Sequence, residues 1–264
     1  PHTVHCLATG EIMISMLGNA NGDGPGGFIL LDEKFDVKGR WEQNADGMNF
    51  NYDFWYQPRQ NVMVSSEWAA PNTVAQGFKP ADVAAGKYGK QLHFWNWKER
   101  SLMQSIDLGE QGWIPLEVRF LHNPDSDQGF VGAALSSKIW RWWRQDDRWH
   151  AEPAVSVENV IVDGWSFPFP GLITDLVVSL DDRFLYFSNW LHGDIRQYDI
   201  SDPTKPKLTG QLYLGGVLGR TPSVRGKRLS GGPQMLQLSY DGKRLYVTNS
   251  LYSPWANQFY PDIK

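Results

Sequence analysis

The stretch VSLDDRFLYFSN, residues 178–189, recurs 60 residues later as LSYDGKRLYVTN, residues 238–249. The two copies share a Ser, an Asp, a Leu-Tyr pair and an Asn at the same relative positions. Each copy reads as a strand, an Asp-containing turn and a second strand rich in Leu, Tyr, Phe and Val. Asp-Gly and related turns supply the positive φ that a two-residue hairpin needs. The repeat therefore predicts the β-hairpin as the structural unit of this chain.

Weaker copies of this hairpin pattern occur along the rest of the sequence. They are CLATGEIMIS (6–15), YQPRQNVMVS (56–65) and RFLHNPDSDQGFVGAALS (119–136). The segments that fit a third strand are GGFILLD (26–32), KQLHFWNW (90–97), KIWRWWR (138–144) and GDIRQYDIS (193–201). Units of roughly 50 to 60 residues are close to the period of propeller blades, whereas a β-sandwich predicts no internal repeat. We therefore predict an all-β fold, a β-propeller of four-stranded blades, with about four to five units present.

The boundaries of the repeat predict one domain. The first unit lacks its lead-in, and the last stops at QFYPDIK without completing a sheet. A propeller cut in this way exposes unpaired strand edges. We therefore predict a single β-propeller domain over residues 1–264 that is incomplete at both termini. The only candidate helix is PADVAAGKYG (80–89).

Composition limits the partners and the compartment. Net charge is −4, with no basic excess, which argues against broad contact with nucleic acid or anionic membranes. No apolar run is long enough to span a bilayer. The single cysteine cannot form an internal disulfide, which favours a cytoplasmic protein. A periplasmic location is the alternative if the parent protein carries a signal peptide, and the oligomeric state is left open.

Blade geometry sorts the candidate polar residues. The start of an inner strand and the loop after the second strand lie on the same face of a propeller disc. His2, His5, Glu67 and His192 fall on that face, whereas His122 lies in a hairpin and falls on the other. Imidazole is the commonest transition-metal ligand, so this set is a candidate metal site.

Structural roles compete with the metal hypothesis. Residues three apart on a strand point to opposite sides, so one of His2 and His5 is expected to be packing or supporting. A lone histidine in a β protein is more often a hydrogen-bonded structural residue. Cys6 offers a soft ligand, but a free cysteine is usually a small buried filler, which is the role that we predict.

Several long segments resemble the selenium-binding protein family. They are HTVHCLATGEIMIS, YDFWYQPRQNVMVSSEWAAPN, IPLEVRFLHNPD, GFVGAALSS, PGLITDLVVSLDDRFLYFSNWLHGDIRQYDISDP, GGPQMLQLSYDGKRLYVTNSLYSPW and QFYPD. The resemblance covers nearly the whole chain and implies a propeller of about seven blades. It also implies copper-dependent oxidation of methanethiol by O2 and water to formaldehyde, hydrogen sulfide and hydrogen peroxide. Some members of the family bind selenium.

The resemblance carries site residues over to this chain. The histidines of HTVHC, FLHNP and NWLHGD become predicted copper ligands, namely His2, His5, His122 and His192. We predict that Glu67 and Asp175 are catalytic carboxylates that orient these imidazoles, and that Trp68 and Trp190 wall an apolar substrate pocket. The cysteine that the family links to selenium lies outside this chain, so Cys6 is not assigned to it.

A propeller without catalysis is the alternative. It would serve as a selenium or thiol carrier, or as a protein-interaction scaffold, because fold does not fix function. Gathered imidazoles at the axis favour the oxidase, whereas an apolar or salt-bridged axis favours the carrier or scaffold.

Overall fold

The computed structural model describes residues 1–44, 46–163, 167–221 and 223–262, and four four-stranded antiparallel sheets dominate it. The first sheet contains β1 (Val4–Cys6), β2 (Ile12–Met16), β3 (Gly27–Leu31) and β4 (Val37–Arg40). The second contains β5 (Phe54–Gln57), β6 (Val62–Ser66), β7 (Gln91–Asn96) and β8 (Ser101–Asp107). The third contains β9 (Pro115–Phe120), β10 (Gln128–Ala133), β11 (Lys138–Gln145) and β12 (Arg148–Ser156). The fourth contains β13 (Ile173–Val178), β14 (Phe184–Asn189), β15 (Asp194–Asp199) and β16 (Lys207–Tyr213).

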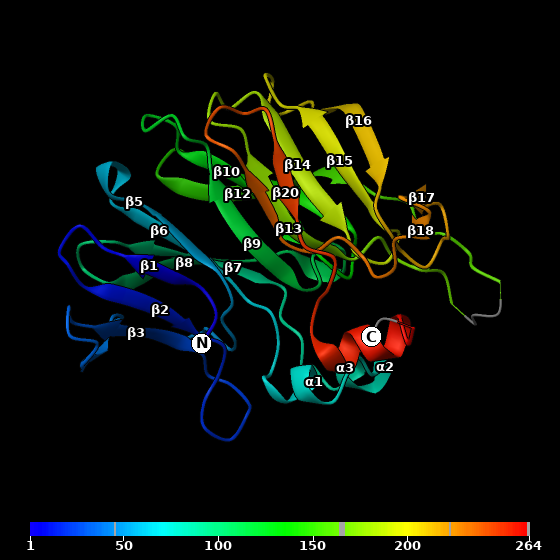
Figure 1. The fold of residues 1–264 in the computed structure, drawn as a ribbon. Helices are drawn as coiled ribbons and strands as arrows, with labels where there is room; N and C mark the ends of the chain where they lie inside the picture. The colour runs from blue at the N-terminus through cyan, green and yellow to red at the C-terminus, as the bar shows by residue number, and fades with distance from the viewer. Residues whose placement is uncertain (45, 164–166, 222, 263–264) are drawn as a thin grey trace.

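Two hairpins and a few short helices complete the described chain. The hairpins pair β17 (Ser223–Val224) with β18 (Lys227–Arg228), and β19 (Leu236–Leu238) with β20 (Leu245–Val247). The α-helices are α1 (Asn72–Ala75), α2 (Pro80–Ala84) and α3 (Ser253–Phe259), and the 3₁₀ turns are η1 (Pro58–Gln60) and η2 (Gly109–Gln111). The three α-helices gather on one side of the sheets (Figure 1).

The two hairpin turns of the sequence repeat contain the same Ser–Asp hydrogen bond and the same left-handed position. In the β13–β14 turn, the Ser179 hydroxyl donates to Asp181 at 2.5 Å, and Asp182 adopts a φ of +57°. In the β19–β20 turn, the Ser239 hydroxyl donates to Asp241 at 2.6 Å, and Gly242 adopts a φ of +67°. The shared Ser and Asp therefore close the turn, and the next position supplies the left-handed backbone.

The sheets follow one another in chain order, and the first strands of the second, third and fourth sheets lie side by side (Figure 1). Strand β5 contacts β9, β9 contacts β13, and β13 contacts β19. Apolar clusters fill the spaces between successive sheets. Their fully buried members include Phe28, Phe54 and Trp95 between the first and second sheets, Phe94 and Trp142 between the second and third, and Leu176 and Phe187 between the third and fourth. Each such side chain contributes roughly 1.5–3 kcal/mol by leaving water.

These observations confirm the predicted all-β fold of four-stranded blades. The four complete sheets and the β19–β20 hairpin match the predicted four to five units. Helix α2 lies within the predicted segment 80–89. Helix α3 was not predicted, although Pro254 at its start fits the first turn of a helix.

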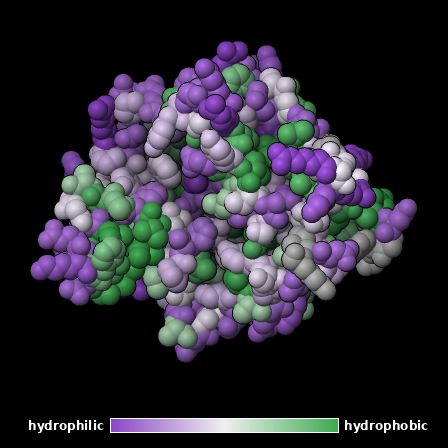
Figure 2. All heavy atoms as spheres, viewed as in Figure 1, coloured by the Kyte–Doolittle hydropathy of each residue, from purple (hydrophilic) through white to green (hydrophobic). Residues whose placement is uncertain are grey.

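The structure corrects the prediction for Cys6, which lies on β1 at the edge of the first sheet. This cysteine is exposed, so it is not a buried filler. Val4, two residues earlier on β1, is 55% exposed. Figure 2 shows hydrophobic residues gathered over β1 and β2 on this face. Strand β1 therefore leaves one side open within the described chain, which explains why Cys6 is not packed.

Candidate functional site

Three acidic residues occupy corresponding places near the starts of three inner strands. Asp53 immediately precedes β5, Glu117 lies on β9, and Asp175 lies on β13. The Asp53 carboxylate accepts the backbone N–H of Val118 at 2.9 Å, and the Asp175 carboxylate accepts that of Leu236 at 2.6 Å. Each of these two acids therefore ties its own inner strand to the next one around the axis.

Arg119 joins the three acids into one group, which we call the axial cluster. Its Nη1 lies 2.6 Å from Asp53 Oδ2, and its Nη2 lies 3.2 Å from Glu117 Oε2. The same Nη2 lies 3.9 Å from Asp175 Oδ1. The acids are 1–3% exposed. One guanidinium thus faces three buried carboxyl groups, and one positive charge cannot balance them all.

The three acids respond differently to this shared environment. Burial raises the pKa of Glu117 well above its ordinary value, and the charge of Asp53 raises it further. Burial also raises the pKa of Asp175 to about 7, although Arg119 and two backbone N–H groups oppose the shift. Burial opposes ionisation of Asp53 as well. Arg119 and the hydrogen bonds that Asp53 accepts nevertheless hold its pKa below the ordinary value.

A cavity of about 290 Å³ opens beside Arg119 and Asp175. His122, Gln237, Ser239 and Tyr240 also line it. So does Trp55, whose ring centre lies 4.9 Å from the Arg119 guanidinium. A β-bulge between Ile173 and Asp175 interrupts the register of β13 with β14. Bulges beside functional sites often re-aim a side chain, and this one lies where Asp175 turns toward the next inner strand.

The predicted ligands His2 and His5 both lie against the segment that contains β5. The His2 ring stacks on Tyr52 with centroids 3.7 Å apart, and its Nδ1 lies 3.0 Å from Thr3 Oγ1. The His5 ring lies 4.6 Å from that of Phe54. Burial lowers the pKa of both imidazoles, so both favour the neutral form. Both rings are thus held by aromatic packing.

His122 and His192 lie at opposite ends of the blades, as predicted. His122 follows β9 in the hairpin loop, and its Nε2 lies 3.1 Å from the carbonyl oxygen of Val178. His192 lies in the β14–β15 loop, is 2% exposed, and places its Nε2 3.0 Å from the carbonyl oxygen of Phe169. Each of these nitrogens donates to a backbone carbonyl and is not available to a metal in this arrangement.

The predicted metal ligands do not come together. Across the part of the chain that the structure describes, no three His, Cys, Asp or Glu side chains are placed to hold one metal ion. Their placement agrees, because His122 lies in the β9–β10 hairpin loop and His192 lies in the β14–β15 loop at the opposite end of the blades. These residues therefore do not fit a copper centre by themselves.

Glu67 lies inside the second blade and pairs with a histidine that the sequence did not single out. Glu67 is 1% exposed, and its Oε1 accepts the backbone N–H of Asn49 at 2.8 Å and that of Phe50 at 3.3 Å. The Nε2 of His93 lies 3.1 Å from the same oxygen. These bonds fix the segment that leads into β5.

Trp68 and Trp190 belong to one aromatic cluster on the helical side of the blades. Trp68 stacks on Tyr252 at 5.2 Å and lines a small cavity of about 20 Å³. Trp190 is fully buried and contacts Phe259 and Tyr260. The structure thus places the two predicted pocket walls in the same cluster.

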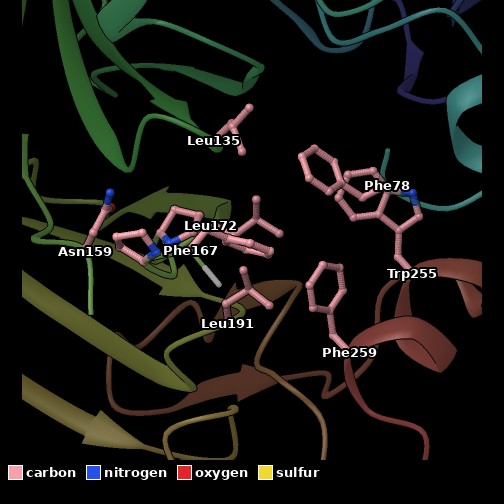
Figure 3. Close-up of a pocket in the computed structure, with 10 residues that line it drawn as sticks. Phe78, Leu135, Asn159, Phe167, Leu172, Leu191, Trp255 and Phe259 are labelled. Carbon is pink, nitrogen blue, oxygen red and sulfur yellow. The ribbon is translucent and has the colours of Figure 1, made fainter. Parts of the chain in front are cut away.

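A larger apolar cavity of about 230 Å³ lies next to that cluster (Figure 3). Phe78, Trp255 and Phe259 come from the helical side, and Leu172 and Leu191 come from loops of the fourth blade. Asn159 is the one labelled residue with a polar side chain (Figure 3). This cavity offers shape and apolar surface, whereas the axial cavity also offers titratable groups.

Sequence reasoning missed Asp53, Glu117 and Arg119. The signal was present, because NYDFWY, PLEVRF and ITDLVV each carry an acid at the start of an inner strand. The copies of the repeat match most strongly at their turns, so the repeat alone does not mark the acids at the strand starts.

The fold and the axial cluster define a β-propeller with a buried, charged axis. Its family is shown by sequence: the chain belongs to the 56 kDa selenium-binding protein family, whose match covers residues 1–264. A Xenopus laevis protein named methanethiol oxidase is 58% identical over 100% of this chain and 60% of its own length. A human protein of the same name is 56% identical over 99% of this chain and 60% of its own length. The chain therefore spans about 60% of the length of these curated relatives.

Solved structures agree with the family and the fold. The X-ray structure of a hypothetical selenium-binding protein from Sulfolobus tokodaii matches with a TM-score of 0.93 and 43% identity, over 99% of this chain and 60% of that one. The β-propeller domain of Swd1 from Myceliophteria thermophila matches with a TM-score of 0.57 and 11% identity, over 94% of this chain and 62% of that one. The second likeness concerns the fold alone. No helix among the described residues has the length and apolar composition needed to cross a membrane.

Proposed function

We propose that the protein containing this chain oxidises methanethiol. The observation that carries the proposal is the 56–58% identity to relatives named methanethiol oxidase. The reaction consumes methanethiol, O2 and water and yields formaldehyde, hydrogen sulfide and hydrogen peroxide. The chain also supplies a cavity at the propeller axis, where enzymes of this architecture have room for a small ligand.

Within this proposal, Asp175 accepts the thiol proton. Oxidation of a thiol begins more readily from the thiolate, so a base beside the sulfur assists it. A base is most effective when its pKa lies near the working pH, and the pKa of Asp175 is raised to about 7. Asp175 lines the axial cavity, and Arg119 in the same wall stabilises the negative charge that develops on the sulfur.

No step is assigned to a metal. The described residues do not fit a copper centre by themselves, so copper and selenium are proposed only for the whole protein. The predicted site roles remain hypotheses for the whole protein at Glu67, His2, His5, His122 and His192. Metal analysis of the full-length protein tests the copper proposal directly.

The test compares the full-length protein with its Asp175→Asn variant. Methanethiol consumption and peroxide release are measured together, and the variant is expected to lose roughly 100-fold or more in kcat/KM. Asp202→Asn, a change in an exposed turn, is the matched control and should keep full activity. Full activity in Asp175→Asn would remove Asp175 from the reaction.

A carrier or scaffold is the second candidate, and the salt-bridged axis favours it. A saturated axis with no reacting ligand would serve to hold the blades together. In that case the wild-type protein consumes no methanethiol and releases no peroxide. Selenium or thiol binding without turnover would then define the carrier.

A further inference from the structure

The axial cluster contains more acid than its surroundings can neutralise. Asp53, Glu117 and Asp175 face one guanidinium, that of Arg119, and all three carboxyl groups are buried. A buried carboxylate without a compensating charge is costly, and such a group usually becomes neutral by binding a proton. Charge alone therefore calls for at least one proton in the cluster.

Hydrogen bonding indicates where that proton lies. Asp53 and Glu117 both contact the Arg119 guanidinium, with Asp53 Oδ2 2.6 Å from Nη1 and Glu117 Oε2 3.2 Å from Nη2. Two buried carboxyl groups on one guanidinium are coupled, and the group with fewer hydrogen-bond donors is the one that keeps a proton. Asp53 is already supplied with donors, since Thr3 Oγ1 donates to its Oδ1, and Val118 N and Arg119 Nη1 donate to its Oδ2. The proton therefore belongs on Glu117.

The environment of Glu117 agrees. Its Oε2 accepts from Arg119 Nη2 at 3.2 Å, whereas its buried Oε1 meets no donor among the described residues. An ionised carboxylate with one oxygen left bare in the interior is expensive, whereas a carboxylic acid needs fewer donors. The other groups that act on Glu117 or on its partners are Tyr252, Tyr52, Asp175, His2 and His5. Burial lowers the pKa of both histidines, so their imidazoles add no fixed positive charge.

We infer that Asp53 and Glu117 form a carboxyl pair at the propeller axis that binds one proton, carried by Glu117, in the folded protein at neutral pH. The pair leaves Arg119 balanced by Asp53 alone. Asp175, which lines the cavity, is then the acid of the cluster without a full counter-charge. This charge arrangement stands whether or not the protein oxidises methanethiol.

The test is infrared spectroscopy of the full-length protein in D2O at pH 8. A buried carboxylic acid shows a C=O stretch above the amide band, at a frequency where carboxylates do not absorb. We expect one such band in the wild type, its loss in Glu117→Gln, and its retention in Glu110→Gln, whose side chain is 80% exposed. Asp175→Asn should also keep the band, which separates Glu117 from the other acid of raised pKa.

Two further variants keep the inference falsifiable. Asp53→Asn removes the charge that balances Arg119, so Glu117 becomes the counter-ion of that guanidinium and gives up its proton, and the band should disappear although Glu117 is intact. Glu117→Gln offers the same donor and acceptor as the neutral acid and should unfold at nearly the wild-type denaturant concentration, whereas Glu117→Leu should unfold at a lower one. Absence of the band in the folded wild type, or its persistence in Glu117→Gln, overturns the inference.

Discussion

Two acidic sites in this propeller are equally buried and differ in chemistry. In the second blade, one oxygen of Glu67 receives two backbone N–H groups and the His93 ring. At the axis, three carboxyl groups share Arg119. The first site has enough donors for its acid, and the second has too few. Burial therefore produces a structural tie in one place and titratable groups in the other.

Glu67 should give the largest effect on stability. Glu67→Ala leaves the His93 ring and two backbone N–H groups buried without an acceptor, and we expect a loss of about 3–5 kcal/mol in the free energy of unfolding. Denaturant unfolding of the full-length protein measures it. Glu110→Ala, at an exposed position, is the control and should change stability by less than about 0.5 kcal/mol.

A different outcome would reverse this half of the comparison. If Glu67→Ala stays as stable as the wild type but loses turnover, Glu67 becomes the catalytic carboxylate that the sequence predicted. The close approach of Gly89 to Glu67 offers a second check. A Cβ at Gly89 would lie 2.4 Å from Glu67 Cβ, so Gly89→Ala should also destabilise the protein.

The pH dependence of the free energy of unfolding tests the axial cluster in this comparison. The pKa of Asp175 is raised to about 7 in the folded protein from an ordinary value of 3.8, so the folded state holds its proton more tightly than the unfolded chain. Stability from this group is full below pH 3.8 and is lost as pH rises toward 7. Within that window the loss is about 1.4 kcal/mol for each pH unit.

Asp175→Asn removes this group, so the variant should lose less stability between pH 5 and 7 than the wild type does. Thermal or denaturant unfolding across that range measures the difference. Asp175 helps to raise the pKa of Glu117, so Glu117 contributes in the same direction in both proteins but less in the variant, which adds to the expected difference. Parallel curves for the two proteins would show that Asp175 is already ionised across that range.

The sequence predicted the blades better than it predicted the site, and the reason is physical. Hairpin turns depend on local residues. The Ser and Asp shared by the β13–β14 and β19–β20 turns therefore predict these turns directly from the sequence. The axial cluster depends on residues 53, 117, 119 and 175, which meet only after three blades have formed. His93 illustrates the same limit, because its partner Glu67 lies across the β6–β7 connection.

The histidines extend the comparison. His192 resembles Glu67 in being buried with its hydrogen bond made, here to the carbonyl of Phe169. We expect His192→Ala to cost about 1–3 kcal/mol of stability, since that carbonyl loses its donor, whereas the hypothesis that His192 is a copper ligand of the whole protein predicts loss of copper. Elemental analysis and denaturant unfolding measure the two effects. Loss of stoichiometric copper with unchanged stability would instead make His192 a ligand.

Ser105 provides the smallest and most specific prediction. Its hydroxyl lies 2.8 Å from His93 Nδ1, and Glu67 accepts from the opposite ring nitrogen. The ring hydrogen therefore sits on Nε2, and Nδ1 accepts from Ser105. Because Ser105 is exposed on β8, water replaces its hydroxyl when the residue becomes alanine. We expect Ser105→Ala to cost only about 0.5–1 kcal/mol by denaturant unfolding. A loss as large as that of Glu67→Ala would show that the tie depends on the whole chain of Ser105, His93 and Glu67. A small loss would show that most of the stabilisation comes from the bond between Glu67 and His93.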